Sequence, residues 1–244
     1  MTVGTTPSIP KTKDLTPKIP TYFYAYPEIS GIVVAAYQTG REITRQTLIR
    51  DRSSNKEITD NWWAVNMGTP SQHQLAMTMD SLQYLSPEPI PIGYSLRHFK
   101  DGDEKSWESI IMGAFSRYRN FSKVMAADKY FRPERIIFAC HSLAGPVATA
   151  AAWHVPNMPQ DVGYLYMVGA VPSHTGRNLG YAVCAAALNQ MLAEGKTSAL
   201  LITDDFRLPA IKTYLRLGFQ PKVFHPRQIL IWDRVMSQLH TRSE

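Results

Sequence analysis

From residue 94 onward, the spacing of apolar and polar positions predicts strands and helices that alternate along the chain. Residues 94–99 alternate as a half-buried strand does. Trp107, Ile110, Ile111 and Phe115 then fall on one face of a helix. Apolar runs that are too short for helices predict further strands at residues 135–140, 146–154, 164–171 and 199–203.

A helical period returns twice in the second half of the chain. One helix begins near Gly180 and keeps one apolar face, made of Tyr181, Cys184, Ala185, Leu188, Met191 and Leu192. A shorter helix contains Ile211 and Tyr214 and ends at Gly218, because glycine readily adopts the left-handed backbone that terminates helices. Residues 222–232 are expected to form one or two further strands. This order predicts an α/β fold with a mixed central sheet flanked by helices.

The first 90 residues have a different character. Residues 1–20 contain four prolines among threonine, lysine and serine, and we expect a flexible arm there. Residues 21–90 are predicted to form an N-terminal extension of mixed strand and coil, with strands at 22–26 and 31–37. Three prolines follow Ser86 within six residues, so we place the boundary there and expect a domain over residues 92–244.

The amino-acid composition excludes several classes of protein. The 244 residues are 44% apolar and 19% charged, which excludes a chain that is disordered throughout. No apolar run approaches the ~18 residues of a membrane helix, and the polar start is unlike a secretory signal. Two cysteines are too few for a disulfide scaffold or a structural zinc site. We therefore expect a cytoplasmic protein with no membrane partner and no metal.

The net charge of +6 does not by itself indicate nucleic acid. The basic residues are scattered, and we find no zinc-finger spacing or RNA-binding aromatic signature. We expect no nucleic-acid partner, whereas a polyanionic small ligand agrees with the charge.

The turn before the Gly180 helix is the strongest candidate for a binding site. A strand ends near Val171, a glycine-bearing turn follows, and a helix begins. Backbone N–H groups at such a helix start bind a diphosphate without charged side chains. Gly176 and Gly180 let the backbone approach the ligand closely, and Arg177 can add a cation.

Two stretches together resemble the GNAT family of acetyl-CoA-dependent N-acyltransferases. The turn is similar to the family's pyrophosphate loop, although Thr175 and Asn178 stand where the family has Arg or Gln and its middle glycine. Further on, Ala210, Tyr214 and Gly218-Phe219 match the spacing A-x-x-x-Y-x-x-x-G-F, with Arg207 in place of the usual asparagine. The resemblance covers about residues 92–235 and implies a GNAT-type fold.

The resemblance also implies an activity and a set of site residues. The expected reaction transfers an acetyl group from acetyl-CoA, the acyl donor, to a primary amine of a small molecule or peptide in a ternary complex. Tyr214 would be the general acid that protonates the departing thiolate. The expected contacts to acetyl-CoA are Gly169, Ala170, Val171, Thr175, Gly176, Arg177, Asn178, Leu179, Gly180, Tyr181, Ala182 and Arg207. Gly169 would permit a bulge that separates the strand from its neighbour.

The general base is not identified by the sequence. Tyr164, Tyr166, His154 and His174 lie near the expected strands and turns. Asp204 and Asp205 follow a strand and are interpreted as caps of the next helix. His154 is expected to end a strand in solvent.

Two other functions stay open. A GNAT-like chain can bind acyl-CoA or a partner and catalyse nothing. A serine hydrolase would use Ser142, in His141-Ser-Leu-Ala-Gly145, with Asp204 and either His225 or His240. In that case the two glycine positions of the nucleophile turn would be Cys140 and Ala144, where side chains crowd the backbone. A monomer and a homodimer both remain compatible with the sequence.

Overall fold

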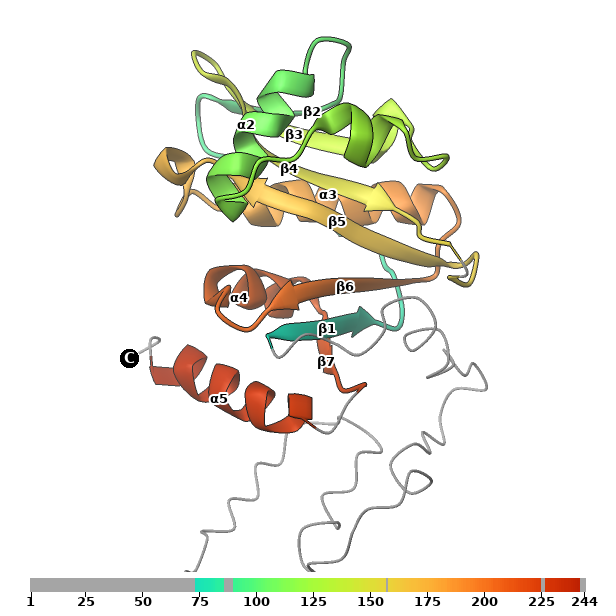
Figure 1. The fold of residues 1–244 in the computed structure, drawn as a ribbon, viewed down its shortest axis with the longest axis vertical. Coiled ribbons are helices and arrows are strands. Elements are labelled where there is room, and N and C mark those ends of the chain that lie inside the picture. Colours follow the sequence, from blue (N-terminus) through green and yellow to red (C-terminus); the bar gives the residue numbers. More distant parts are fainter. Residues whose placement is uncertain (1–72, 86–89, 157, 225–226, 242–244) are drawn as a thin grey trace, which may run out of the picture. The chain divides into compact units, whose positions relative to one another are not determined.

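The computed structural model describes residues 73–85, 90–156, 158–224 and 227–241, which contain a sheet of seven strands in the order β2-β3-β4-β5-β6-β1-β7 (Figure 1). The strands are β1 (Gln74–Met79), β2 (Tyr94–His98), β3 (Ile136–His141), β4 (Gly145–Trp153), β5 (Val162–Ala170), β6 (Ser198–Asp204) and β7 (Gln220–Lys222). The α-helices are α2 (Glu104–Phe115), α3 (Leu179–Ala193), α4 (Leu208–Leu217) and α5 (Arg227–Thr241).

The sheet is mixed, as predicted. β5 and β6 pair in parallel, and every other neighbouring pair is antiparallel. The α2 residues Trp107 and Ile110 pack on one face of the sheet with Phe138. On the other face, Val183 of α3 and Ile211 of α4 pack with a second apolar cluster. Helices therefore flank a central sheet on both sides, which confirms the predicted fold class.

Most predicted elements are present within one or two residues of their expected bounds. The helix through Trp107 is α2, and the helix near Gly180 is α3, which begins at Leu179. α4 ends where expected, because Gly218 adopts φ +101°, a conformation that suits glycine.

The strands expected over residues 222–232 are wrong. β7 ends at Lys222, and α5 begins at Arg227. Gln228, Trp232 and Val235 are buried and lie about one helical turn apart. The apolar run at residues 229–232 masked this longer period, because a short apolar segment fits a strand and a helix equally well.

β1 is a strand that the sequence did not reveal. Leu75, Ala76 and Met77 are fully buried, so both faces of the strand are covered and no alternation of apolar and polar residues marks it. β1 lies inside the region expected as an extension, yet it pairs with both β6 and β7. The flexible arm and the two strands at 22–26 and 31–37 lie outside the described residues, and the division into three parts stays a prediction.

Shortening a buried β1 side chain should destabilise the whole sheet. We expect Met77→Ala to lower the free energy of unfolding by about 2–5 kcal/mol, since it leaves a cavity between the sheet and its helices. Urea unfolding followed by circular dichroism measures this. Asp80→Ala, at an exposed position just after β1, is the matched control and should stay within about 0.5 kcal/mol. An unchanged midpoint for Met77→Ala would contradict the position of β1 in the sheet.

Candidate functional site

The site begins where two parallel strands stop pairing. β5 and β6 are paired only from Val162 to Tyr164 on β5 and from Ser198 to Leu200 on β6. Beyond Tyr164, β5 stays paired with β4, so its edge toward β6 carries backbone N–H and C=O groups without strand partners on that side. The two strands draw apart in this direction (Figure 1).

A bulge in β5 accompanies the separation. Tyr166 pairs with Ala151 and Gly169 pairs with Thr149, so two β5 residues stand opposite the single residue Ala150. Met167 carries the unusual backbone there, with φ +48°. Such a bulge bends and twists the strand that contains it. The bulge therefore explains why β5 leaves β6.

A bulge is present as expected, but it lies just before Gly169, and Met167 has the positive φ. The φ of Gly169 is not positive, and the importance of this residue is one of space: a Cβ on Gly169 would lie 2.8 Å from Cβ of Ala114 in α2. Glycine at this position lets α2 pack closely on β5. Met167 was missed because a methionine gives no sequence signal for a left-handed backbone. Ala170 ends β5, and the next residue, Val171, donates its N–H to Val147 O at 2.9 Å.

The turn after β5 has the form that the sequence suggested. A short 3-10 turn (Pro172–His174) leads into Thr175, Gly176 and Arg177, all of which are exposed. Gly176 and Asn178 adopt positive φ angles of +73° and +59°. Asparagine tolerates this conformation better than most residues, so Asn178 can replace a glycine here.

The first backbone donors of α3 have no partner within the helix. The first intrahelical bond runs from Ala182 N–H to Asn178 O, so the amides of Leu179, Gly180 and Tyr181 precede it. No side-chain hydrogen bond caps this turn within the described residues. A Cβ on Gly176 or Gly180 would meet no atom within 4 Å. The buried side chains of Leu179 and Ala182 anchor the helix from the opposite side.

Arg216 of α4 holds this turn and was not singled out by the sequence. Its Nη2 donates to Oδ1 of Asn178 at 2.9 Å. Its guanidinium also lies 4.1 Å from the ring centre of Tyr181. Arg216 thus links the left-handed Asn178 to the first turn of α3.

Arg207 lies at the junction of β6 and α4 and points toward α2. Its Nε donates to Asp204 at 3.2 Å, and its Nη1 lies 3.4 Å from Ala114 O. The guanidinium stacks on the ring of Phe115 at 4.0 Å. Arg207 therefore connects the carboxyl end of β6 to the carboxyl end of α2.

Tyr214 is buried on α4, where its ring contacts that of Phe219. Burial raises the pKa of Tyr214 far above its ordinary value, and nearby Cys184 and Tyr164 raise it further, while Arg207 acts in the opposite direction. The hydroxyl is therefore protonated at neutral pH, and burial makes it a weaker acid than a free tyrosine.

The candidate bases are scattered. Tyr164 and Tyr166 lie on β5 with ring centres 5.5 Å apart, and burial raises the pKa of both. His174 lies in the turn after β5, where its Nδ1 is 2.7 Å from the Tyr94 hydroxyl. Desolvation lowers the pKa of His174, and His141 and Arg177 lower it further.

His154 differs from its expected position in solvent. It is 3% exposed, its Nδ1 lies 3.4 Å from Val162 O, and burial lowers its pKa. Val162 is at the amino end of β5, whereas the pairing with β6 is lost toward the carboxyl end. His154 is therefore remote from the site.

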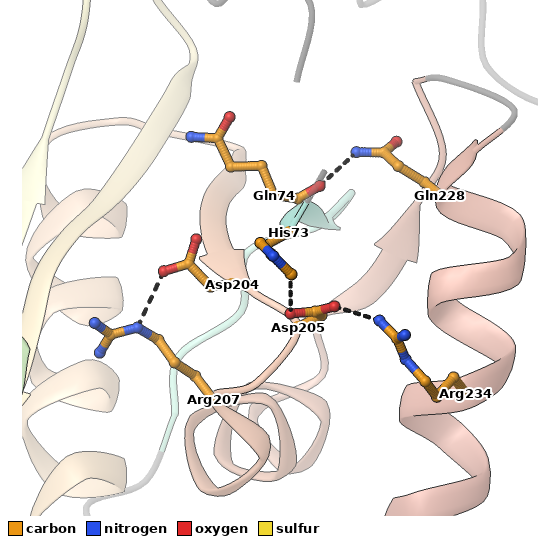
Figure 2. Close-up of polar contacts among 7 residues, drawn as sticks. All are labelled: His73, Gln74, Asp204, Asp205, Arg207, Gln228 and Arg234. Atoms are coloured by element: carbon orange, nitrogen blue, oxygen red, sulfur yellow. Dashed lines mark hydrogen bonds and ion pairs between the residues drawn. The ribbon is translucent and has the colours of Figure 1, made fainter. Parts of the chain in front are cut away.

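Asp204 and Asp205 are not helix caps, and that interpretation is wrong. Their side chains point in different directions at the end of β6 (Figure 2). Asp204 binds Arg207, whereas buried Asp205 binds His73 at 3.1 Å and also Arg234 of α5. Asp205 thus joins the residue before β1 and the C-terminal helix to the end of β6.

The hydrolase alternative is also wrong. Ser142 lies in the tight turn between the antiparallel strands β3 and β4, and its N–H donates to Gly93 O at 2.8 Å. A nucleophile elbow joins a strand to a helix, whereas the element directly after Ser142 is the strand β4. Asp204, its expected partner, is engaged by Arg207.

Two kinds of feature, a membrane-spanning helix and a cluster of metal-binding side chains, are absent from the part of the chain that the structure describes. No helix there is both long and apolar enough to span a membrane. No group of three or more His, Cys, Asp or Glu side chains there is arranged to hold a metal ion.

Comparison with known proteins places this geometry in context. Residues 104–219 match the model of the acetyltransferase (GNAT) family. A mycothiol acetyltransferase of Streptomyces bingchenggensis is 28% identical over 142 residues, which are 54% of this chain and 45% of that protein. A second, from Renibacterium salmoninarum, is 28% identical over 156 residues, which are 60% of this chain and 46% of that protein. The chain thus spans about half the length of these curated relatives.

Solved structures give similar matches. A GCN5-related N-acetyltransferase from Sphaerobacter thermophilus has a TM-score of 0.49 at 22% identity, over 61% of this chain and 48% of the other. One from Kribbella flavida has a TM-score of 0.46 at 25% identity, over 62% of this chain and 55% of the other.

Removal of the buried carboxylate at the end of β6 should loosen β1 and α5. We expect Asp205→Ala to lower the free energy of unfolding by about 1–3 kcal/mol, because His73 and Arg234 lose hydrogen bonds but keep access to water. Thermal unfolding measures the change. Asp233→Ala, at an exposed position of α5, should have an effect of less than about 0.5 kcal/mol. Equal melting curves for the two variants would show that the Asp205 network adds nothing to stability.

Proposed function

Residues 104–219 of this chain belong to the acetyltransferase (GNAT) family, and from this we propose that the protein transfers an acetyl group from acetyl-CoA to a primary amine of a small molecule or peptide. The mycothiol acetyltransferases are relatives at 28% identity, which supports acetyl transfer to an amine in general. Our proposal does not extend to the acceptor of the mycothiol acetyltransferases, because this chain spans only about half of their length.

The observation that carries the proposal is the uncapped start of α3 beside the unpaired edge of β5. In our proposal the diphosphate of coenzyme A lies against residues 175–182 and accepts hydrogen bonds from the amides of residues 176–181, since those of Thr175 and Ala182 already have backbone partners. The dipole of the 15-residue helix α3 adds a favourable field at this end. Exposed Arg177 supplies a further positive charge.

The pantetheine arm would lie along residues 169–171 of β5. Its amides can pair with backbone groups that β6 leaves unpaired. The thioester would then lie between the separated strands, where a backbone N–H can stabilise the negative charge that develops on the carbonyl oxygen. We assign Arg207 to this acyl end of the carrier, because it lies between the end of β6 and α2.

The reaction we propose is direct attack. The lone pair of the neutral amine forms a C–N bond to the thioester carbonyl carbon, and collapse of the tetrahedral intermediate breaks the C–S bond. The nitrogen loses a proton, and the departing thiolate gains one. Tyr214 is our candidate donor of that second proton, because it stands at the tyrosine of the A-x-x-x-Y-x-x-x-G-F spacing that resembles the family.

A negative charge in the first turn of α3 should block the carrier while leaving the fold intact. We expect Gly180→Asp to weaken coenzyme A binding by at least about tenfold through repulsion of the diphosphate. The helix itself should tolerate the change, because a Cβ at Gly180 meets no atom and a carboxylate suits a helix start. Calorimetric titration with coenzyme A gives the affinity.

Gly180→Asn, of the same size without the charge, separates repulsion from steric blocking. Equal affinity for wild type and Gly180→Asp would exclude this turn as the diphosphate site.

Loss of the Tyr214 hydroxyl should slow chemistry more than binding. We expect Tyr214→Phe to lower kcat by about 10²-fold or more, with the affinity for acetyl-CoA changed less than about threefold. Thiol release, measured with a range of amines, reports turnover. Unchanged turnover under conditions in which chemistry limits the rate would remove the role of Tyr214. Tight binding of coenzyme A by the wild type without release on any amine would instead indicate a non-catalytic binding protein.

A further inference from the structure

The proposed function, if it holds, restricts the side of the sheet from which the acceptor amine can reach the thioester. α3, whose first turn would hold the diphosphate, packs on the same face of the sheet as α4. α2 packs on the other face, together with Leu200 of β6 and Tyr164 and Tyr166 of β5. An amine that attacks the thioester must come from a side that the carrier does not occupy. The face that α2 covers, near its carboxyl end, is that side.

Arg207 presents its guanidinium on this face. Successive side chains of a strand alternate, so Asp204 lies on the same side of β6 as Leu200 and Ile202, which pack with the α2 cluster. Asp204 holds Nε of Arg207, and Phe115 supports the guanidinium plane. These contacts leave further N–H donors on the outer edge of the guanidinium.

A second arginine, Arg119, lies in the segment after α2 and near Tyr166 of β5. Ser116 ends α2 in a left-handed conformation, and the chain turns back. Buried Glu108 then fixes this segment by accepting hydrogen bonds from Asn120 Nδ2 at 3.1 Å and from Phe121 N–H at 3.0 Å. Arg119 directly precedes these two anchored residues, so its backbone is held in place.

The side chain of Arg119 has an unmet hydrogen-bond requirement. Its Nε is buried and has no hydrogen-bond partner among the described residues. The positive charge lies close enough to Tyr166 to lower the pKa of that tyrosine, against the raising effect of burial. A buried donor that no protein group satisfies favours a ligand acceptor in its place. The Arg119 guanidinium therefore lies near Tyr166, on the face of the sheet on which α2 packs.

We propose that the acceptor amine also carries a carboxylate, and that Arg119 binds this carboxylate while the amino group faces the thioester. A planar guanidinium offers paired N–H donors that match the two oxygens of a carboxylate. A simple cationic amine would meet two positive charges on this face. Amino-acid-like acceptors are therefore the predicted substrate class, and this inference rests on the proposed function.

The test compares matched pairs of acceptors. α-, β- and γ-amino acids are assayed beside their carboxamides by thiol release, with rates compared per neutral amine because the carboxamides are less basic. We expect the wild type to prefer the acids by about tenfold or more in kcat/KM, and Arg119→Gln to remove most of that preference. Arg119→Lys keeps the positive charge but lacks the planar guanidinium, so its preference for the acids should lie between that of the wild type and that of Arg119→Gln. Arg117→Gln, an exposed neighbour, should behave as wild type.

The outcomes separate this inference from the proposed function. Carboxamide turnover that is unchanged in Arg119→Gln, with acid turnover lost, supports the inference and shows that the variant is folded. Equal or better use of carboxamides by the wild type overturns it and leaves acetyl transfer in place. If no amine releases thiol, the inference is tested by the change in melting temperature that amino acids produce at saturating coenzyme A. Stabilisation of the wild type but not of Arg119→Gln supports the carboxylate site, and no stabilisation overturns it.

Discussion

The site depends on the short pairing between β5 and β6, which covers three residues of each strand. The extra residue at Met167 bends β5 away, and Gly169 lets α2 follow the bent strand closely. A fully paired β5 would have no backbone groups left for a ligand. Because β5 and β6 lack a few hydrogen bonds to each other, backbone N–H and C=O groups inside the sheet remain available to a ligand. In a fully paired sheet the neighbouring strand would bind them. The uncapped α3 begins directly beyond this edge.

Much of this arrangement was predictable because its signals are local. Glycines in a turn between a strand and a helix indicated the loop before α3, and the period of apolar residues gave α2, α3 and α4. Asn178 could be identified as a substitute for glycine, since its side chain tolerates the left-handed backbone that it adopts.

Long-range features were not predictable from one sequence. Nothing local to β1 shows that it pairs with β6, because both of its faces are buried. The bulge at Met167 depends on the pairing with β4, and the partners of Asp205 come from distant segments, so neither leaves a local pattern. α5 was misread because its apolar run is short enough to fit a strand. Arg119 is distinguished by a buried Nε without a partner among the described residues and by the neighbours that Glu108 anchors, and a sequence shows neither.

The position of β1 has a consequence for how the chain reaches its native state. His73, beside β1, bonds to Asp205, 132 positions further along, and β1 has no strand to pair with until β6 and β7 have been made. During synthesis, Leu75 and Met77 therefore emerge long before β6 can cover them. Contacts of such high sequence separation slow folding, and an apolar strand that waits for its partner is prone to aggregation. The pairing of β1 with β6 is therefore expected to form late in folding.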